Sequence, residues 1–453
     1  MRKERTMQEK NSGLTKKHLL GYTLGDLGEC MTFSIMGSFL TRYYINVAMI
    51  DTAVLAILTL IWKICDAASS PLIGMCMDYM FAKKKYKAGK FRPWMLRTTP
   101  LLAITAILVF TAPNLVDGMS KLVVVFVTYL LYEVVYSMFN IPYGSLLSAM
   151  SQNEGERAML SSARGVGGML GSMLPTVLFP IIITGFERTP ELGYGLGVTI
   201  CAVAGFVMCF LSYAFTEERC GDVDKKEVQE TKVTDIINSI RYNQAFLALI
   251  IHGVFQGMNQ AINMTMGTYM FSDVLGNMTY MSVSYVLTMP LSMCVLLFSP
   301  KLIQKHGTMP IIQKSLVIGS GIYVLLFIMH ILTNVNVWVH MIVSALAGTF
   351  TNVGVMMQWG LVGQTVDFNE KILGKRSEGS IYGMFNMVRR VGQAIGSSGS
   401  VAILGLIGYS VAISNAGGTQ SDFTILGIKV LCILVPAFAS MGSWVAFRYI
   451  WGD

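Results

Sequence analysis

The feature that most constrains this chain is the recurrence of long apolar segments from one end to the other. Nearly uncharged runs such as 101–111, 122–132, 198–211 and 316–329 recur throughout the 453 residues. A hydrocarbon core of ~30 Å requires about 20 apolar helical residues, and about twelve segments meet that criterion. Only 13% of the residues are charged, whereas soluble domains carry roughly twice that fraction. The pattern predicts an all-α polytopic membrane protein and excludes a β-barrel, whose strands are ~10 residues long and alternate in polarity.

Lysine and arginine are concentrated in alternate loops, as they are in the cytoplasmic loops of membrane proteins. Basic residues crowd the N-terminal tail and the loops after the second, sixth and tenth predicted spans, and the intervening loops carry little basic charge. This alternation predicts a multi-pass protein of the cell (cytoplasmic) membrane with both termini in the cytoplasm. The first 18 residues are polar and basic, so we expect no cleavable signal peptide.

A hydrophilic stretch rich in Glu, Asp and Lys divides the chain into two parts of similar length. Two bundles of about six helices on either side of such a loop make the major facilitator fold, in which the substrate site lies near the bilayer midplane. The predicted organisation is a cytoplasmic tail over 1–18, a six-helix bundle over 19–215, a central loop over 216–243, a second bundle over 244–449 and a cytoplasmic C-terminus over 450–453.

Several classes of protein need residues that this sequence lacks. The eight cysteines show no paired or metal-ligand spacing, so neither a disulfide framework nor a zinc site is expected. The sequence contains no phosphate-binding Gly-Lys-Ser/Thr loop and no catalytic Ser-His-Asp arrangement in a soluble region, which argues against an ATP-driven pump, an enzyme and a bound cofactor. Membrane topology explains the excess positive charge, so nucleic acid is not an expected partner. We expect a monomer in the lipid bilayer that handles a small solute.

Ionisable side chains inside the predicted spans are the main functional signal, because an unpaired charge at membrane depth is costly. Carboxylates beside hydroxyls suit a hard cation such as sodium, and a single buried acid suits a proton. Asp66 could instead pair with Lys63 and only steady its helix. The polar residues of the first bundle are Asp26, Glu29 and Cys30 in the first span, Asp66, Ser69 and Ser70 in the second, Glu133, Ser137, Asn140 and Tyr143 in the fourth, and Arg164 in the fifth.

The second bundle carries a polar stripe on its first span. Amide side chains there recur every three or four residues and so share one helix face. Such side chains can each make two hydrogen bonds to a hydroxyl-rich ligand, so the stripe is predicted to line a cavity. His252 by itself is more typical of a hydrogen-bonded core histidine than of a proton relay. The residues are His252, Gln256, Asn259 or Gln260, and Asn263, joined by Tyr382, Asn386, Arg389, Arg390 and Gln393 of the eleventh span.

Glycines at helical spacing crowd the fifth and eleventh spans. Small residues let two helix backbones approach closely within a membrane, which predicts tight packing and leaves a role in motion open. The glycines are Gly165, Gly167, Gly168 and Gly171 in the fifth span and Gly392, Gly396 and Gly399 in the eleventh.

Short motifs occur in a fixed order along nearly the whole chain. They lie at 21–26, 66–71, 89–94, 140–146, 163–165, 365–370 and 378–396. Through these motifs the chain resembles the glycoside–pentoside–hexuronide:cation symporters of the major facilitator superfamily, among which the bacterial glucuronide carriers, and then melibiose permease, are the most similar.

The resemblance implies import of a sugar-type solute by alternating access, with sodium, lithium or a proton as the coupling ion. It places sugar contacts on Cys30, Asn140 and Arg164, and the basic residue of the eleventh span on Arg390. The predicted cation-coupling set is Asp66, Ser69, Ser70, Ser137 and Glu133. The predicted substrate-binding set is Asp26, Glu29, Cys30, Asn140, Tyr143, Arg164, Gln256, Asn263, Asn386 and Arg390. The predicted gating set is Asp78, Arg157, Asp367, Arg376 and Glu378.

Two departures from the family pattern affect these predictions. Ser70 stands where the family often has a second acid, which weakens a sodium site and favours a proton, although Glu133 could restore the charge. Cys30 stands where the family has Asp or Asn to hold a sugar hydroxyl, and Asp26 or Glu29 could compensate.

Three functions follow from these observations. The first is a symporter for a glycoside, hexuronide or glucuronide-type conjugate. The second is a cation-linked carrier or uniporter of an amphipathic solute such as a steroid or lysolipid. The third is a non-transporting receptor on the same fold.

Overall fold

The computed structural model describes residues 14–83, 89, 91–151, 154–219, 241–373 and 378–451. For some residues within six of the helices, it describes the backbone alone. Every regular element within these ranges is helical, in agreement with the predicted all-α fold. Eight helical segments of the described chain are long and apolar enough to cross a membrane. Helices α2, α3, α10 and α13 are also long but less uniformly apolar, because they carry polar residues or lie partly outside the described side chains.

The chain divides into two compact units. One contains Met1–Met36 and Ala68–Glu227, and the other contains Gly37–Ala67 and Val228–Asp453. The second unit therefore includes the end of the first helix and the start of the second, together with the C-terminal part of the chain.

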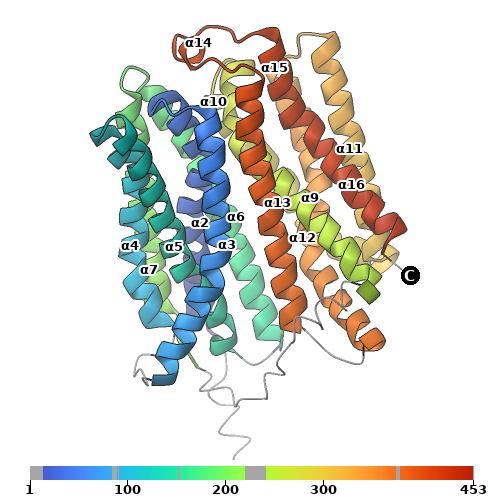
Figure 1. The fold of residues 1–453 in the computed structure, drawn as a ribbon. Coiled ribbons are helices and arrows are strands. Elements are labelled where there is room, and N and C mark those ends of the chain that lie inside the picture. Colours follow the sequence, from blue (N-terminus) through green and yellow to red (C-terminus); the bar gives the residue numbers. More distant parts are fainter. Residues whose placement is uncertain are drawn as a thin grey trace, which may run out of the picture. The chain divides into compact units, whose positions relative to one another are not determined.

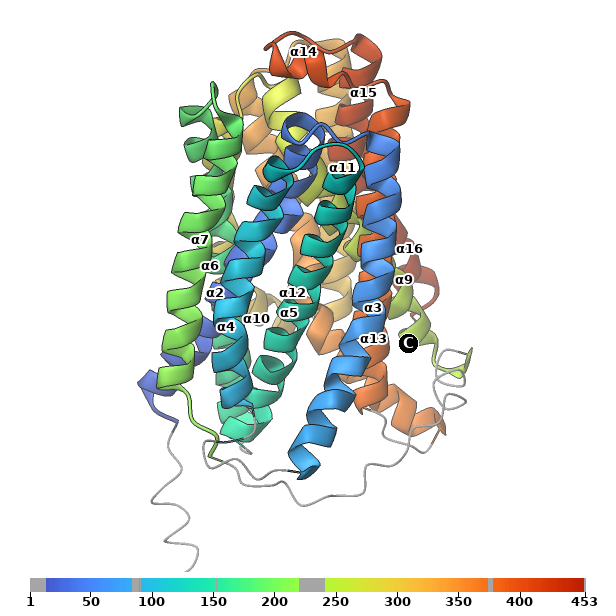
Figure 2. The ribbon, with the colours of Figure 1, turned by 60° about the vertical axis from the view of Figure 1, so that its left-hand side comes forward.

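The first unit is built from the following helices: α2 (Lys16–Arg42) up to Met36, α3 (Thr52–Lys83) from Ala68, α4 (Arg92–Thr111), the short η2 (Ala112–Leu115), α5 (Met119–Met150), α6 (Glu154–Gly185) and α7 (Pro190–Phe215). Helix α4 packs against α5 and α7, and α6 packs against α5 and α7, as can be followed in Figure 2. Phe110, Phe179 and Tyr194 form an aromatic cluster at one end, with ring centroids 5.8 to 6.2 Å apart.

The second unit contains the remaining helices: α9 (Gln244–Tyr269), η3 (Met270–Val274), α10 (Thr279–His306), α11 (Thr308–Leu332), α12 (Val337–Leu373), α13 (Glu378–Leu406), α14 (Val411–Asn415), α15 (Asp422–Lys429), η4 (Val430–Leu434) and α16 (Val435–Tyr449), together with η1 (Tyr43–Val47). Helix α9 packs against α13 and α16, and α11 packs against α12 and α16, as Figure 1 shows. Buried apolar residues such as Phe246, Leu316 and Phe385 form its core.

Helix starts in both units are capped by side chains. The carboxylate of Glu218 accepts the backbone N–H groups of Phe91 and Arg92 at 2.7 and 2.8 Å, where α4 begins. Asn243 accepts the backbone N–H of Phe246 at 3.0 Å at the start of α9. The first N–H groups of a helix have no partner within it, so these caps fix where each helix begins.

The first helices of the two halves of the chain end in the same way. Helix α2 runs into the π-helical turn η1, and α9 runs into the π-helical turn η3. The backbone N–H of Ala48 donates to Tyr43, and that of Leu275 donates to Met270, five residues back in each case. Single π turns inside helices occur frequently at functional positions. Helices α2 and α9 therefore share the geometry of their last turn.

Candidate functional site

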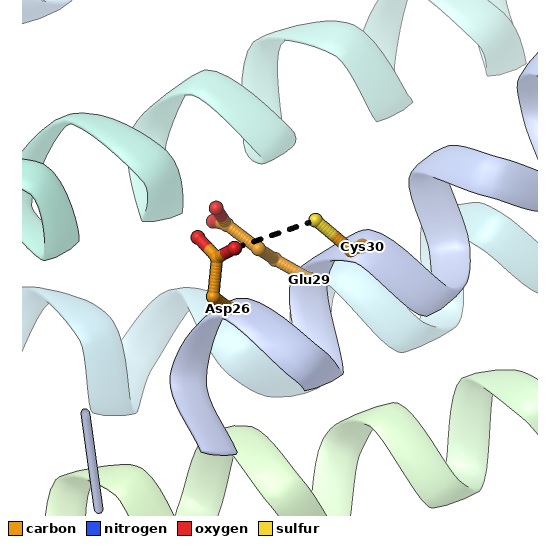
Figure 3. A group of neighbouring side chains, drawn as sticks. All are labelled: Asp26, Glu29 and Cys30. Atoms are coloured by element: carbon orange, nitrogen blue, oxygen red, sulfur yellow. Dashed lines mark hydrogen bonds between the residues drawn. The ribbon is translucent and has the colours of Figure 1, made fainter. Parts of the chain in front are cut away.

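The site begins with three side chains on one face of α2 in the first unit. Asp26, Glu29 and Cys30 are spaced i, i+3, i+4, which places them side by side on a helix. One ligand atom from each lies within 4.8 Å of the others, and Figure 3 shows the two carboxylates turned toward one another beside the thiol. Asp26 is 6% exposed and Glu29 is 1% exposed. Two buried carboxylates at this separation require a neighbouring positive charge, a bound cation or a proton on one of them.

Helix α6 supplies that charge through Arg164. Its Nε–H donates to Asp26 Oδ1 at 2.9 Å, and its Nη2 lies 3.9 Å from Glu29 Oε1. The guanidinium carbon also lies 5.1 Å from the centre of the Tyr143 ring, close enough for a cation–π contact. One third of the Arg164 side chain stays exposed. The arginine is therefore both held by the site and accessible to a ligand.

Glycines on α6 let this arginine reach α2. A side chain at Gly168 would lie 2.5 Å from Asp26 Oδ2, and one at Gly167 or Gly171 would collide with a backbone carbonyl of α2. The predicted close approach at these three positions is therefore present. It does not extend to Gly165, where an added Cβ would meet nothing within 4 Å.

Helix α5 completes the site with an amide and an aromatic pair. Asn140 Nδ2 donates to Glu29 Oε1 at 2.6 Å. Tyr143 donates from its hydroxyl to the backbone carbonyl of Tyr22, and the Tyr22 hydroxyl donates to the carbonyl of Tyr143 at 3.3 Å. The two rings are stacked with centroids 4.7 Å apart. This reciprocal pair, which the sequence analysis missed, fixes α5 against α2 at the depth of the carboxylates.

Glu29 is incompletely satisfied in this arrangement. Its Oε1 accepts from Asn140 and faces Arg164, whereas its Oε2 is buried and has no hydrogen-bond partner among the described residues. A buried polar atom without a partner costs free energy comparable to a lost hydrogen bond. This oxygen is therefore a position where a proton or a donor atom of a ligand would be stabilised.

Two of the predicted cation-coupling residues lie further along α5. Glu133 is 4% exposed and accepts the hydroxyl of Tyr129 at 2.5 Å. Ser137 is buried one turn later. The spacing of Tyr129 and Glu133, one helical turn, is the signal that would have revealed this hydrogen bond. Tyr132 donates to the Thr32 hydroxyl at 3.3 Å, so this part of α5 is lined with tyrosines.

Asp66 belongs to the second unit, where its partner is Arg390 of α13. Arg390 Nη1 lies 3.3 Å from both carboxylate oxygens. The structure thus joins a predicted coupling residue to a predicted substrate residue within one unit. Of the other predicted cation-coupling residues with described side chains, Ser137 and Glu133 belong to the first unit.

The polar stripe of α9 is only partly paired. Asn263 donates to Asn259 at 2.7 Å, and Gln393 of α13 donates to Gln260 at 3.0 Å. Gln256 is buried with its amide nitrogen unpartnered among the described residues. His252 is fully buried against Phe447, 4.7 Å between ring centres, and neither ring nitrogen has a described partner. The expected hydrogen-bonded core histidine is therefore buried but unsatisfied.

The remaining residues of the predicted substrate-binding, cation-coupling and gating sets are either placed without a described role or lie outside the described side chains. Asn386 lies half-buried on α13. Glu156, one residue before the predicted gating residue Arg157, accepts the Ser151 hydroxyl at 2.6 Å and the Leu14 backbone N–H at 3.1 Å. The Ser151 hydrogen bond first, and then the Leu14 hydrogen bond, lower the pKa of the Glu156 carboxyl. Residue 376 and the side chains of Ser69, Ser70, Asp78, Arg157, Asp367 and Glu378 lie outside the described residues.

A second ion-pair cluster, which the sequence analysis did not identify, lies in the second unit. Arg42 at the end of α2 donates to Asp273 of η3 at 2.7 Å. Ser414 and Tyr409 donate to the other oxygen of Asp273 at 2.5 and 3.3 Å, and Ser272 donates to the oxygen that Arg42 holds. Arg42 and Asp273 were detectable as isolated charges beside apolar segments, but 231 residues separate them.

The chain is similar to known proteins over nearly its whole length. The family model described as "MFS/sugar transport protein" matches residues 21–450. The chain is 28% identical to a protein named "Uncharacterized symporter YjmB" from Bacillus subtilis (strain 168), over 95% of this chain and 91% of the relative. It is also 28% identical to the "Glucuronide carrier protein homolog" of Escherichia coli (strain K12), over 97% and 93% of the two chains.

The fold has clear counterparts among solved structures. The crystal structure of the nucleoside transporter NupG superposes with a TM-score of 0.62 and 16% identity, covering 96% of this chain and all of the other. At this identity the likeness shows the fold alone. It confirms the predicted major facilitator architecture.

Proposed function

Since the chain belongs to the MFS/sugar transport protein family, we propose that it imports a glycoside, hexuronide or glucuronide-type conjugate by symport with a cation. Members of this family and the proteins of matching fold are membrane transporters, and the chain is not an enzyme. Import would proceed by alternating access in the cytoplasmic membrane, with a proton or sodium as the coupling ion.

The observation that carries the proposal is the partial engagement of Arg164. Its hydrogen bond to Asp26 uses Nε, and its Nη2 lies 3.9 Å from Glu29, beyond hydrogen-bond distance. The terminal N–H groups of a guanidinium match a carboxylate through two parallel hydrogen bonds. A hexuronate carries such a carboxylate on a sugar ring. The name of the Escherichia coli relative, a glucuronide carrier homolog, agrees with this solute class.

The surroundings of Arg164 suit the rest of a sugar. Glu29 and Asn140 are charged and amide groups that can bind hydroxyls. Tyr143 is fully buried and stacked on Tyr22 and Phe139, so its ring supports the guanidinium. The site therefore combines recognition of an anion with recognition of hydroxyls.

A second candidate solute is an amphipathic molecule such as a steroid or lysolipid. One observation favours it: Cys30, a poor hydrogen-bonding residue, lies within the site with its thiol 3.8 Å from Asp26 Oδ2. Tyr132, Tyr136 and Phe33 add a run of rings nearby, with successive centroids 6.1 and 5.5 Å apart. A conjugate with a large apolar aglycone would satisfy both halves of this environment.

Counterflow in proteoliposomes tests the proposal without assuming any coupling ion. Vesicles loaded with unlabelled solute are diluted into labelled aryl glucuronide, the matching neutral aryl glucoside, a steroid or a lysolipid. The proposal expects exchange of the glucuronide, and weaker exchange of the glucoside. Exchange of the steroid or lysolipid alone would support the second candidate instead. Uptake with a proton gradient or a sodium gradient imposed alone then identifies the coupling ion.

A further inference from the structure

The charges around Glu29 do not balance. Two carboxylates, Asp26 and Glu29, face a single guanidinium, that of Arg164. Both acids are nearly fully buried. Burying an uncompensated charge is costly, so a further anion brought to this site favours neutralisation of one carboxyl. One positive charge is therefore lacking at this point of the first unit, among the described residues.

The unpartnered oxygen indicates which acid is affected. Asp26 has Arg164 Nε at 2.9 Å on one oxygen and the Cys30 thiol at 3.8 Å on the other. Glu29 has Asn140 on Oε1 and no described partner on its buried Oε2. A proton on Oε2 would give that oxygen a donor, and the carboxylate of Asp26 lies within the same 4.8 Å group to accept it (Figure 3).

We propose that Glu29 is the proton-coupling residue of this carrier and takes up one proton on Oε2 when an anionic substrate binds Arg164. This rests on the proposed function, because it requires a transported anion. The step is a simple protonation, in which the carboxylate becomes a carboxylic acid and no other bond changes. It assigns to Glu29, on the first helix, the role that the family pattern gives to Asp66.

The reason for the coupling is the charge that the substrate brings. A carboxylate bound to the terminal N–H groups of Arg164 adds a third anion beside one guanidinium. Protonation of Glu29 removes one of the three. Binding of substrate and binding of the proton therefore favour each other by the same factor, and substrate affinity falls as the pH rises and Glu29 loses its proton.

The geometry favours a proton over a metal cation. Arg164 Nη2 lies 3.9 Å from Glu29 Oε1 and would repel a metal ion bound there. The neutral neighbours include the amide nitrogen of Asn140, a donor, and the thiol of Cys30, whereas sodium requires several oxygen ligands. Asp66, the alternative coupling acid, has Arg390 Nη1 3.3 Å from both oxygens and so is already matched in charge.

Titratable groups reach Glu29 from each helix packed around it, and the pH dependence includes their charges. On α2 itself these are Tyr22, Asp26 and Cys30. Helix α6 contributes Arg164, and α7 contributes Cys209. Those on α5 are Tyr132, Tyr136 and Tyr143.

The test counts protons during binding of the aryl glucuronide that exchanges in counterflow. Calorimetry of the purified full-length protein in two buffers of different ionisation enthalpy, at one pH, gives the protons taken up per substrate. At a pH where Glu29 is ionised in the substrate-free protein, we expect about one proton for the wild type and none for Glu29→Gln, whose glucuronide affinity should no longer depend on pH and which should lose uphill accumulation. Glu191→Gln, an exposed acid at the start of α7, is the matched control and should resemble the wild type.

Two outcomes would overturn the proposal. One is proton uptake that persists in Glu29→Gln, with Asp66→Asn abolishing it instead. The other is measured on the wild type and so does not depend on how any variant folds. It is the absence of a new protonated carboxyl band from the substrate-induced infrared difference spectra. Failure of the glucuronide to exchange in the wild type would contradict the proposed function itself, whereas exchange without proton uptake contradicts only the role of Glu29.

Discussion

Two buried arginine–carboxylate clusters in this molecule differ in how completely they are satisfied. In the second unit, Asp273 receives donors from Arg42, Ser272, Tyr409 and Ser414 and faces one arginine. In the first unit, Arg164 faces two acids, and one oxygen of Glu29 has no described partner. Fully satisfied buried networks rigidify a structure, and partly satisfied ones carry a standing cost. We therefore interpret the cluster around Asp273 as structural and propose that a bound ligand completes the cluster around Glu29.

The exposure of the two arginines supports this contrast. Arg164 remains one third exposed, whereas the side chain of Arg42 is 13% exposed and its guanidinium lies 5.2 Å from the centre of the Tyr269 ring. Arg42 also connects the ends of α2 and α9, which share the same π-helical geometry. Disrupting the two clusters should therefore have different consequences, which the following experiments separate.

Arg164→Met should give the largest effect. It leaves two buried acids with no base, and loss of one partner of a buried ion pair costs about 3–5 kcal/mol. We expect glucuronide exchange to fall below detection.

Arg164→Lys keeps the charge but loses the two parallel hydrogen bonds to the substrate carboxylate, worth about 1.5–3 kcal/mol. The KM for glucuronides should therefore rise roughly 10- to 100-fold. Counterflow with the matching neutral glucoside is the control. Equal losses for both solutes would mean that Arg164 is only a structural partner of Asp26.

Asp273→Asn should affect stability rather than transport constants. It leaves Arg42 buried without an anion, so the free energy of unfolding should fall by about 3–5 kcal/mol. The double variant Arg42→Met/Asp273→Leu replaces the pair with apolar groups and should recover most of that loss. Thermal unfolding and the KM of the folded protein are measured together. A single variant of normal stability with an altered KM would break the comparison, because it would make this cluster part of the transport cycle.

Gly168→Ala should give the smallest effect of the three. The added Cβ would lie 2.5 Å from Asp26 Oδ2 and would push that carboxylate away from Arg164. Crowding of this kind costs about 1 kcal/mol, which corresponds to a roughly fivefold rise in KM. Gly165→Ala on the same helix, where the new Cβ would meet nothing within 4 Å, is the matched control and should leave KM unchanged. If both variants behave alike, the close approach of α6 to α2 does not shape the site.

The helical architecture was predictable from the sequence because apolar length is a local property that each segment carries by itself. The sequence also placed Asp26 and Arg164 in one predicted substrate-binding set. The structure joins the two side chains at 2.9 Å. The roles assigned to these residues in substrate and cation binding remain predictions.

Contacts between distant parts of the chain could not be predicted from the sequence. Asp66 meets Arg390 across 324 residues, and Arg42 meets Asp273 across 231. Nothing in the local pattern of either residue identifies its partner. The unpartnered oxygen of Glu29 likewise depends on three helices converging, so the sequence alone does not distinguish the role of Glu29 from that of Asp26. Only the packing of α2, α5 and α6 separates the two acids.

The most direct test of the central claim, that the Asp26–Glu29–Arg164 cluster binds the transported solute, uses the cysteine inside it. The thiol of Cys30 lies 3.8 Å from Asp26 Oδ2 and is partly exposed. Alkylation of the wild-type protein by a small thiol reagent is followed residue by residue with mass spectrometry, with and without saturating aryl glucuronide. The exposed Cys294 of the second unit is the internal control. We expect that substrate slows modification of Cys30 and leaves that of Cys294 unchanged. Equal modification of Cys30 with and without substrate would contradict it.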